Sequence, residues 1–267
     1  MKYLRVIAPQ TSPEGSYGIL NGDKIRLLSG SPLSIHSKET GIVCKLVDVQ
    51  KFLPPIESPN IVALGLNYIE HANESKMEIP TAPVIFLKAT SALIGHKQPI
   101  ILPQEAPLEV DYEAELTVVI GRSAKNISED EAFDYIFGYT CGNDVSARDC
   151  QLRFDKQWAR GKSFDTFAPV GPIIETELDP SNLKVQCFLN GNLMQDGTTK
   201  ELIFHVPQIV SYLSKQMTLF PGTLIMTGTP PGVGYARKPP VFLTPGDEVK
   251  VKIENVGILE NSVINEA

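Results

Sequence analysis

The segment that says most about the fold is Asp111-Tyr112-Glu113-Ala114-Glu115-Leu116-Thr117-Val118-Val119-Ile120-Gly121. It is rich in β-branched residues and ends in a glycine, which predicts a β-strand. Side chains alternate across a strand, so Glu113 and Glu115 project from one face, with their backbones roughly 7 Å apart. Adjacent carboxylates repel unless a cation neutralises them, and Mg²⁺, Mn²⁺ and Ca²⁺ prefer oxygen ligands. The segment therefore indicates either part of a divalent metal site or the polar, solvated face of an edge strand.

The composition indicates a β-rich protein with a substantial core. The chain has 267 residues, 42% of them hydrophobic, with 20 glycines and 21 prolines that require many turns. Its net charge of −7 argues against binding to nucleic acid or to anionic membranes. No apolar run approaches the roughly 18 residues that cross a bilayer, and residues 1–7 are expected to form a strand, not a signal peptide. Four cysteines without CxxC spacing indicate reduced thiols in a cytoplasmic protein.

Turn signals divide the chain into two expected domains. Residues 1–55 form a small β-rich unit with an Asn21-Gly22 hairpin, and Pro54-Pro55 marks a linker to a large domain over residues 56–267. A second Asn-Gly hairpin is expected at Asn190-Gly191. The coarse pattern is α+β, with many short strands, few helices and a sheet that rolls into a barrel or sandwich.

Three helices are expected in the large domain. A short polar one covers about residues 68–76, beside proline-bounded loops that suggest a lid. The capping-box pattern from Ser128 to Glu131 predicts a helix over about residues 129–137. An amphipathic helix ending before Pro221 follows from apolar residues at helical spacing, namely Val206, Ile209, Val210, Leu213 and Met217.

Three further polar clusters could carry chemistry. If Asp144 caps a short helix, Arg148 and Gln151 fall on the same side of it; the alternative is an ordinary cap with an ion pair four residues on. Lys162 is flanked by small residues and could bind a substrate carboxylate or oxyanion, or it could be a surface lysine.

His71 and Glu74 are adjacent on one helical turn, so Glu74 could orient the imidazole as a base; the alternative is a surface pair. The glycine-rich turn from Thr227 to Gly234 lacks the Gly-Lys-Ser/Thr of a phosphate-binding loop.

These clusters occur in the order and with the local sequence of a known family: the chain resembles the fumarylacetoacetate hydrolase family. The resemblance covers about residues 55–265, and the first 55 residues are similar to a small N-terminal domain of many bacterial members. The region from Thr227 to Val249 is most similar to the branch that holds fumarylacetoacetate hydrolase domain-containing protein 2 and oxaloacetate tautomerases. The matching segments are Gly65–Tyr68 with His71 and Glu74, Asp111–Leu116, Asn143–Gln151, Gly161–Thr166 and Thr227–Pro230.

The resemblance implies a fold, a cofactor and roles for nine residues. It implies a mixed β-sandwich roll, a homodimer and a bound Mg²⁺ or Mn²⁺, sometimes Ca²⁺. The implied residues are Glu113, Glu115 and Asp144 as metal ligands, His71, Glu74 and Lys162 as catalytic residues, and Arg148, Gln151 and Thr229 as substrate contacts.

A mechanism follows as a hypothesis. Three carboxylates around a divalent ion leave open positions where a small dianionic 2-oxo acid could chelate, and the ion would stabilise an enolate. Lys162 and Arg148 would offset the substrate charge, while His71 would move a proton or activate water. The leading expectation is C–C bond hydrolysis of acylpyruvates. The alternatives are oxaloacetate tautomerisation or decarboxylation, 2-hydroxyhepta-2,4-diene-1,7-dioate isomerisation, and a non-catalytic, metal-stabilised binding protein.

Overall fold

The central strand of the molecule is β11 (Ala114–Ile120), all seven residues of which are buried. The computed structural model describes residues 1–267 and shows β11 between two antiparallel neighbours, β12 (Ile136–Asn143) and β17 (Leu224–Met226). Because both faces of β11 are covered, its β-branched run is accommodated as a core strand and not as an edge strand.

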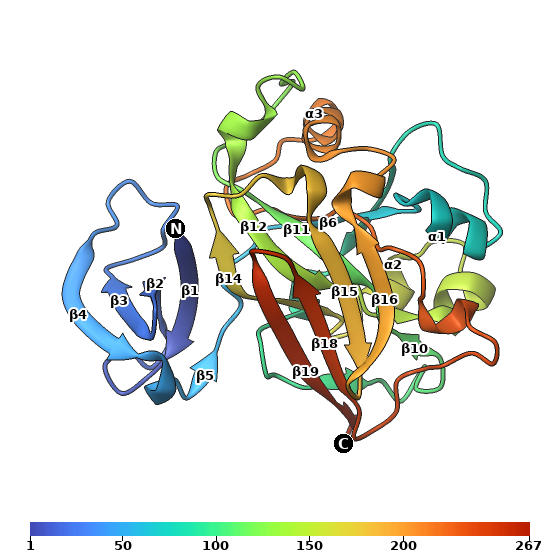
Figure 1. The fold of residues 1–267 in the computed structure, drawn as a ribbon, viewed down its shortest axis with the longest axis horizontal. Helices are drawn as coiled ribbons and strands as arrows, with labels where there is room; N and C mark the ends of the chain where they lie inside the picture. Colours follow the sequence, from blue (N-terminus) through green and yellow to red (C-terminus); the bar gives the residue numbers. More distant parts are fainter.

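The large sheet extends from β11 in both directions (Figure 1). Its strand order is β4-β3-β2-β1-β14-β12-β11-β17-β6-β7, and β5 and β8 pair with β1 and β14. The other strands of this sheet that lie beyond residue 55, in the part called the body below, are β6 (Ile61–Gly65), β7 (Val84–Lys88), β8 (Leu93–Ile94) and β14 (Ala168–Glu175).

A second sheet packs against the first and closes the core. Its order is β16-β15-β18-β19-β9, and in Figure 1 its orange and red strands cross in front of β11 and β12, which they contact. Fifty buried residues form one continuous core, so the α+β, β-rich fold of mixed sheets is confirmed. The strands are β9 (Ile100–Leu102), β15 (Lys184–Leu189), β16 (Asn192–Thr198), β18 (Glu248–Ile253) and β19 (Gly257–Asn265), with a separate pair of β10 (Val110–Asp111) and β13 (Ser146–Ala147).

The first 55 residues have a small core of their own. Six buried residues pack between short antiparallel strands, coloured blue in Figure 1, while β1 also pairs with β14 of the body. We propose a domain boundary at residue 55, which the separate core of the first 55 residues supports. The strands are β1 (Lys2–Ile7), β2 (Ser16–Asn21), β3 (Lys24–Leu28), β4 (Glu39–Lys45) and β5 (Lys51–Phe52).

Both expected hairpins form. Strands β2 and β3 turn directly after Asn21, where Gly22 has a positive φ of 62°. Strands β15 and β16 turn at Asn190 and Gly191, which both have positive φ, as a two-residue hairpin turn requires.

The helices only partly follow the sequence predictions. Helices α1 (Ile69–Glu74) and α3 (Val206–Gln216) form as expected, and α2 (Ala159–Lys162) is a single turn. The predicted helix over residues 129–137 is wrong: Ser128 does bond Glu131, but only one 3₁₀ turn follows, because Ile136 already pairs with Ile120 in the sheet. None of the helices has the length and apolar character needed to cross a membrane.

The remaining turns are short 3₁₀ segments and one π-helix. The π-helix, η4, carries Gln151 and follows β13. Asp149 accepts a hydrogen bond at its start, so the expectation that Asp144 caps a helix here is wrong; Asp144 lies in the turn between β12 and β13. The segments are η1 (Leu46–Asp48), η2 (Thr90–Ala92), η3 (Ala132–Tyr135), η4 (Cys150–Phe154), η5 (Pro180–Asn182), η6 (Thr199–Glu201) and η7 (Gly234–Ala236).

Candidate active site

The paired strands β11 and β12 bring three carboxylates together. Glu113 comes directly before β11, Glu115 lies within it, and Asp144 directly follows β12. The backbone N–H of Asp144 donates to the carbonyl of Glu113 at 2.9 Å, and Asn143 Oδ1 accepts from the N–H of Glu113 at 2.9 Å. One oxygen from each carboxylate lies within 4.8 Å of the other two, and all three residues are buried.

Buried cations neutralise two of these carboxylates. Lys162 Nζ donates to Glu113 Oε2 at 2.8 Å and to Asp144 Oδ2 at 2.6 Å, and Lys88 on β7 donates to Oδ1 of Asp144. Arg148 Nη1 lies 2.7 Å from Glu113 Oε1. Burial alone would raise the pKa of Glu113, but Lys162 and Arg148 hold that pKa well below its usual range. Glu113 is therefore ionised in the folded protein.

Glu115 is the carboxylate without a neutralising cation. Its Oε2 accepts from the N–H of Gly228 at 2.7 Å, whereas its Oε1 is buried and has no hydrogen-bond partner. Burial first, and then the charges of Asp144 and Glu113, raise the pKa of Glu115 well above its usual value. An unpartnered oxygen beside two further carboxylates fits the all-oxygen ligand set of a hard divalent cation.

Asp111, a fourth buried carboxylate, fixes the surroundings of this triad. Its Oδ2 accepts from Arg148 Nε at 2.9 Å and from the N–H of Tyr235 at 3.0 Å, and its Oδ1 accepts from the N–H of Gly234 at 2.8 Å. Together with the triad and its cations, Asp111 makes a buried cluster of four carboxylates and three Lys or Arg side chains. When all seven groups are ionised, the cluster has a net charge of −1. A divalent cation would turn this into one positive charge, which suits an anionic substrate. The members are Asp111, Glu113, Glu115 and Asp144 with Lys88, Arg148 and Lys162.

Helix α1 presents a paired histidine and glutamate to the same region. His71 Nδ1 lies 2.8 Å from Glu74 Oε1, and His71 is buried although α1 is a surface helix. Both oxygens of Glu74 also accept from the N–H of Gly232, at 2.9 and 3.1 Å. Gly232 has a φ of +104°, and a Cβ there would lie 2.2 Å from the carbonyl of Met194, so only glycine fits this contact. The glycine-rich turn therefore holds the end of helix α1 to the body.

These groups surround one small cavity. The centres of water-sized molecules can occupy about 30 Å³ of it. Polar and apolar side chains share the lining. The polar lining residues include His71, Ser75, Glu113, Glu115, Arg148 and Tyr235.

The structure gathers the nine residues predicted from the sequence in this region. Glu113, Glu115, His71, Arg148, Gln151, Lys162 and Thr229 line the cavity, while Glu74 and Asp144 lie behind His71 and Lys162. Gln151 Oε1 accepts from Arg148 Nη1 at 2.8 Å, so these two do share a side despite the incorrect capping prediction. Thr229 donates to the carbonyl of Ala114 at 3.0 Å and is thereby fixed to β11. The surface-lysine alternative for Lys162 is excluded, because that residue is 2% exposed.

Four residues at the site escaped the sequence analysis. Lys88 ends a strand, and its only local signal was a charge at the end of an apolar run. Asp111 was quoted as the first residue of the decisive segment, but its partners lie 37 and 124 residues away. Ser75 and Tyr235 belong to loops with no motif that marks them.

Comparisons with known proteins show the family of the chain. A family model described as fumarylacetoacetate (FAA) hydrolase C-terminal matches residues 60–264, and one described as Rv2993c-like, N-terminal, matches residues 1–55. A Dictyostelium discoideum protein named fumarylacetoacetate hydrolase domain-containing protein 2 homolog is 54% identical over 226 residues, covering 80% of this chain and 74% of that protein.

A Rattus norvegicus protein named oxaloacetate tautomerase Fahd2a, mitochondrial, is 45% identical over 217 residues, covering 80% of this chain and 69% of that protein. A solved structure from Mycobacterium marinum, named 2-hydroxyhepta-2,4-diene-1,7-dioate isomerase, is 39% identical with a TM-score of 0.87, covering 100% of this chain and 99% of that one. The chain therefore belongs to the fumarylacetoacetate hydrolase family, in the branch of the domain-containing protein 2 and oxaloacetate tautomerase relatives.

Proposed function

We propose that this protein is a divalent-metal-dependent enzyme that interconverts the keto and enol forms of a small 2-oxo acid, with oxaloacetate as the leading substrate. One observation carries the proposal: a single cavity is lined by Glu115, whose Oε1 has no hydrogen-bond partner, and by His71, whose Nδ1 is bonded to Glu74. The names of the rat and mycobacterial relatives, a tautomerase and an isomerase, support a proton-transfer reaction.

Glu113, Glu115 and Asp144 would hold the ion, for which we propose Mg²⁺ or Mn²⁺, with Ca²⁺ also compatible with oxygen ligands. When bound, such an ion supplies Lewis-acid stabilisation of negative charge on the keto oxygen of the substrate. Lys162 keeps Glu113 and Asp144 ionised and oriented, because its ammonium group bonds an oxygen of each. Arg148, Gln151 and Thr229 would contact the substrate.

His71 would carry the proton. With Nδ1 held by Glu74, Nε2 is free to take a proton from C3 of the 2-oxo acid. As that proton leaves, the C2–C3 double bond forms and the carbonyl electron pair moves to the oxygen, which accepts a proton in turn. The reaction is an isomerisation, so no atom is gained or lost.

Helix α1 would act as a lid over this reaction. His71 on α1 lines the cavity, and α1 is held to the body through the two hydrogen bonds from Gly232 to Glu74. Opening of α1 would admit substrate, and closure would return His71 to the cavity and exclude bulk water.

Hydrolysis of an acylpyruvate is the second candidate, favoured by the description of the matching family model. Here water adds to the acyl carbonyl carbon, the bond to the neighbouring methylene breaks, and a carboxylate and pyruvate leave with one proton. The same residues would serve, with His71 activating the water.

Two assays on oxaloacetate and acetylpyruvate test the proposal. Wild type with Mg²⁺ should speed the loss of enol-oxaloacetate absorbance, and EDTA or His71→Asn should abolish this effect. Product analysis distinguishes pyruvate release with CO₂ from pyruvate release with acetate. If wild type accelerates no reaction of either compound or of a related dienol, the enzyme proposal fails and a non-catalytic binding protein becomes the better account.

We also propose that the protein is cytoplasmic and forms a homodimer; the family resemblance implies the homodimer. The four cysteines are all free and buried, which is compatible with a reducing compartment. Light scattering of the purified protein would decide the oligomeric state: a mass of one chain, 29.3 kDa, contradicts the dimer.

A further inference from the structure

The cavity contains unpartnered polar atoms of two opposite kinds. Glu115 Oε1 is an acceptor without a donor. Ser75 Oγ and Arg148 Nη2 are buried and make no hydrogen bond of good geometry, although Nη2 lies 2.8 Å from Asp111 Oδ2. Buried polar groups that are left unpaired destabilise the folded protein. The first kind suits a cation, and the second suits an anionic group of a ligand.

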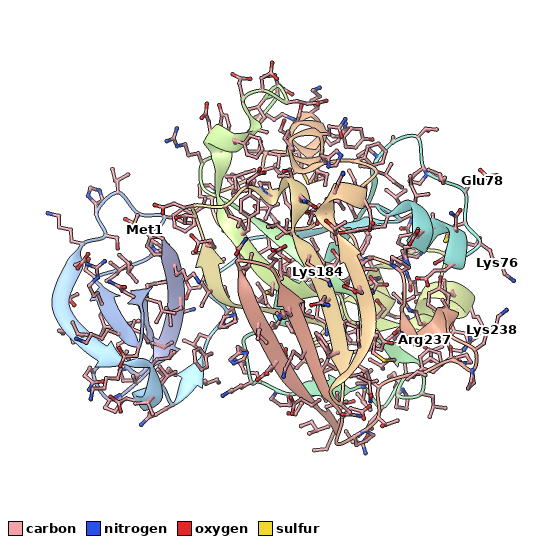
Figure 2. All side chains as sticks on the ribbon, in the orientation of Figure 1. Met1, Lys76, Glu78, Lys184, Arg237 and Lys238 are labelled. Atoms are coloured by element: carbon pink, nitrogen blue, oxygen red, sulfur yellow. The ribbon has the colours of Figure 1, made fainter.

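Ser75 and Tyr235 come from two loops that meet at the edge of the cavity. Ser75 is the first residue after α1, directly beyond Glu74, and Tyr235 lies in η7. Figure 2 shows Lys76 and Glu78 of the first loop at the same edge of the molecule as Arg237 and Lys238 of the second. Ser75 and Tyr235 both line the cavity.

Tyr235 is held in a fixed position between Ser75 and Arg148. Its backbone N–H donates to Asp111 at 3.0 Å, and the guanidinium carbon of Arg148 lies 4.6 Å from the centre of its ring. Burial raises the pKa of Tyr235 while the nearby Ser75 hydroxyl lowers it, so the Tyr235 hydroxyl stays protonated at neutral pH and can donate. The acidic neighbours of Tyr235 are Glu74 and Glu113, and both already have partners. Glu74 pairs with His71 and Gly232, and Glu113 pairs with Lys162 and Arg148.

We propose that Ser75, Tyr235 and Nη2 of Arg148 form a subsite for a second carboxylate of the substrate, and so select dicarboxylic over monocarboxylic 2-oxo acids. This rests on the proposed function. The 2-oxo acid group would face Glu113, Glu115 and Asp144, and the remote carboxylate would accept from the Ser75 and Tyr235 hydroxyls and from Arg148. Because Ser75 is at the end of the lid helix, the remote carboxylate would also hold the lid closed.

Matched substrates test the subsite. Oxaloacetate and 2-oxobutanoate differ only by a carboxylate in place of a methyl group, and exchange of C3 protons in D₂O, above the enzyme-free rate, measures enolisation of both. Ser75→Ala and Tyr235→Phe should each lower kcat/KM for oxaloacetate about tenfold, since each removes one hydrogen bond to a charged group. The same variants should leave 2-oxobutanoate exchange within about twofold, and Ser75→Thr should restore the oxaloacetate rate.

Met77→Ala is the matched control, because Met77 also lines the cavity but offers no donor, so it should affect both substrates alike. Equal losses on both substrates, or no loss on either, in Ser75→Ala and Tyr235→Phe would overturn the subsite. Calorimetric binding of malate and 2-hydroxybutanoate to the Mg²⁺-loaded protein separates this outcome from failure of the proposed function. If wild type enolises neither acid, the proposed function fails, but the subsite still predicts that both variants weaken the binding of malate and not that of 2-hydroxybutanoate. The subsite is refuted if the binding of malate is unchanged or if both ligands are weakened alike.

Discussion

Replacing Glu115 by glutamine should stabilise the protein in EDTA but remove the stabilisation that wild type gains from Mg²⁺. Glu115→Gln keeps an oxygen for the N–H of Gly228 and removes the one carboxylate that lacks a cation. Two unit charges 4.8 Å apart, the upper limit of the oxygen–oxygen distances within the triad, repel by about 3 kcal/mol at an effective dielectric constant near 20. Lys162 already offsets Glu113 and Asp144, so the expected net gain is about 1–3 kcal/mol.

With Mg²⁺ bound, wild type should be the more stable of the two proteins. An ion present at 100 times its dissociation constant stabilises the folded protein by about 2.7 kcal/mol, and Glu115→Gln should lose most of that gain. The pH dependence in EDTA has a definite sign. Because the pKa of Glu115 is raised in the folded state, the contribution of Glu115 to wild-type stability falls as pH rises above the usual value of 4.5, so the advantage of the variant should grow.

Urea denaturation followed by fluorescence gives these numbers, because the chain has one tryptophan, Trp158, and it lines the cavity. The exposed Glu129→Gln is the matched charge control and should respond to Mg²⁺ like wild type. The reasoning is refuted if Mg²⁺, Mn²⁺ and Ca²⁺ all leave wild-type stability unchanged, or if Glu115→Gln gains as much from them as wild type.

Three other perturbations have defined outcomes. His71→Asn should lower the enolisation rate by about 10²–10⁴-fold with Mg²⁺ affinity unchanged by calorimetry, and equal loss of both would mean that His71 acts through the metal site. His96 accepts from the N–H of Glu260, and burial lowers the pKa of His96 from 6.5 to about 4. The unfolded chain thus binds the extra proton between these values, so the contribution of His96 to stability should rise from pH 4 to 6.5. In urea titrations His96→Gln should remove this contribution and make the slope of stability against pH less positive than in wild type; an unchanged slope contradicts the assignment. Gly65→Ala would place a Cβ 2.4 Å from the ring of Trp158 and should cost about 1–3 kcal/mol in the same titrations, whereas no loss would show that the ring moves freely.

Sequence reasoning succeeded where the signal was local. The alternation of Glu113 and Glu115, the Asn190-Gly191 turn and the apolar periodicity of α3 each depend on neighbours within a few residues. The helix predicted over residues 129–137 failed because strand pairing of Ile136 outweighed a correct capping contact at Ser128.

The polar partners of the site were outside the reach of such reasoning. Lys162 bonds a carboxylate 49 residues away, Lys88 one 56 residues away, and Gly232 one 158 residues away. Only the folded sheet brings these groups together, and the sequence around Lys88 or Gly232 offers no pattern that names a partner. The family resemblance identified Lys162 as a site residue. It did not indicate that buried cations pair with Glu113 and Asp144 but not with Glu115.

A crystal grown with Mn²⁺ and oxalate and measured for anomalous scattering at the manganese edge would show directly whether the three buried carboxylates hold a divalent ion. The account predicts one strong anomalous peak within bonding distance of an oxygen from each of Glu113, Glu115 and Asp144, with oxalate completing the coordination. A peak elsewhere, or no peak beside a fully ordered Glu115, would contradict it.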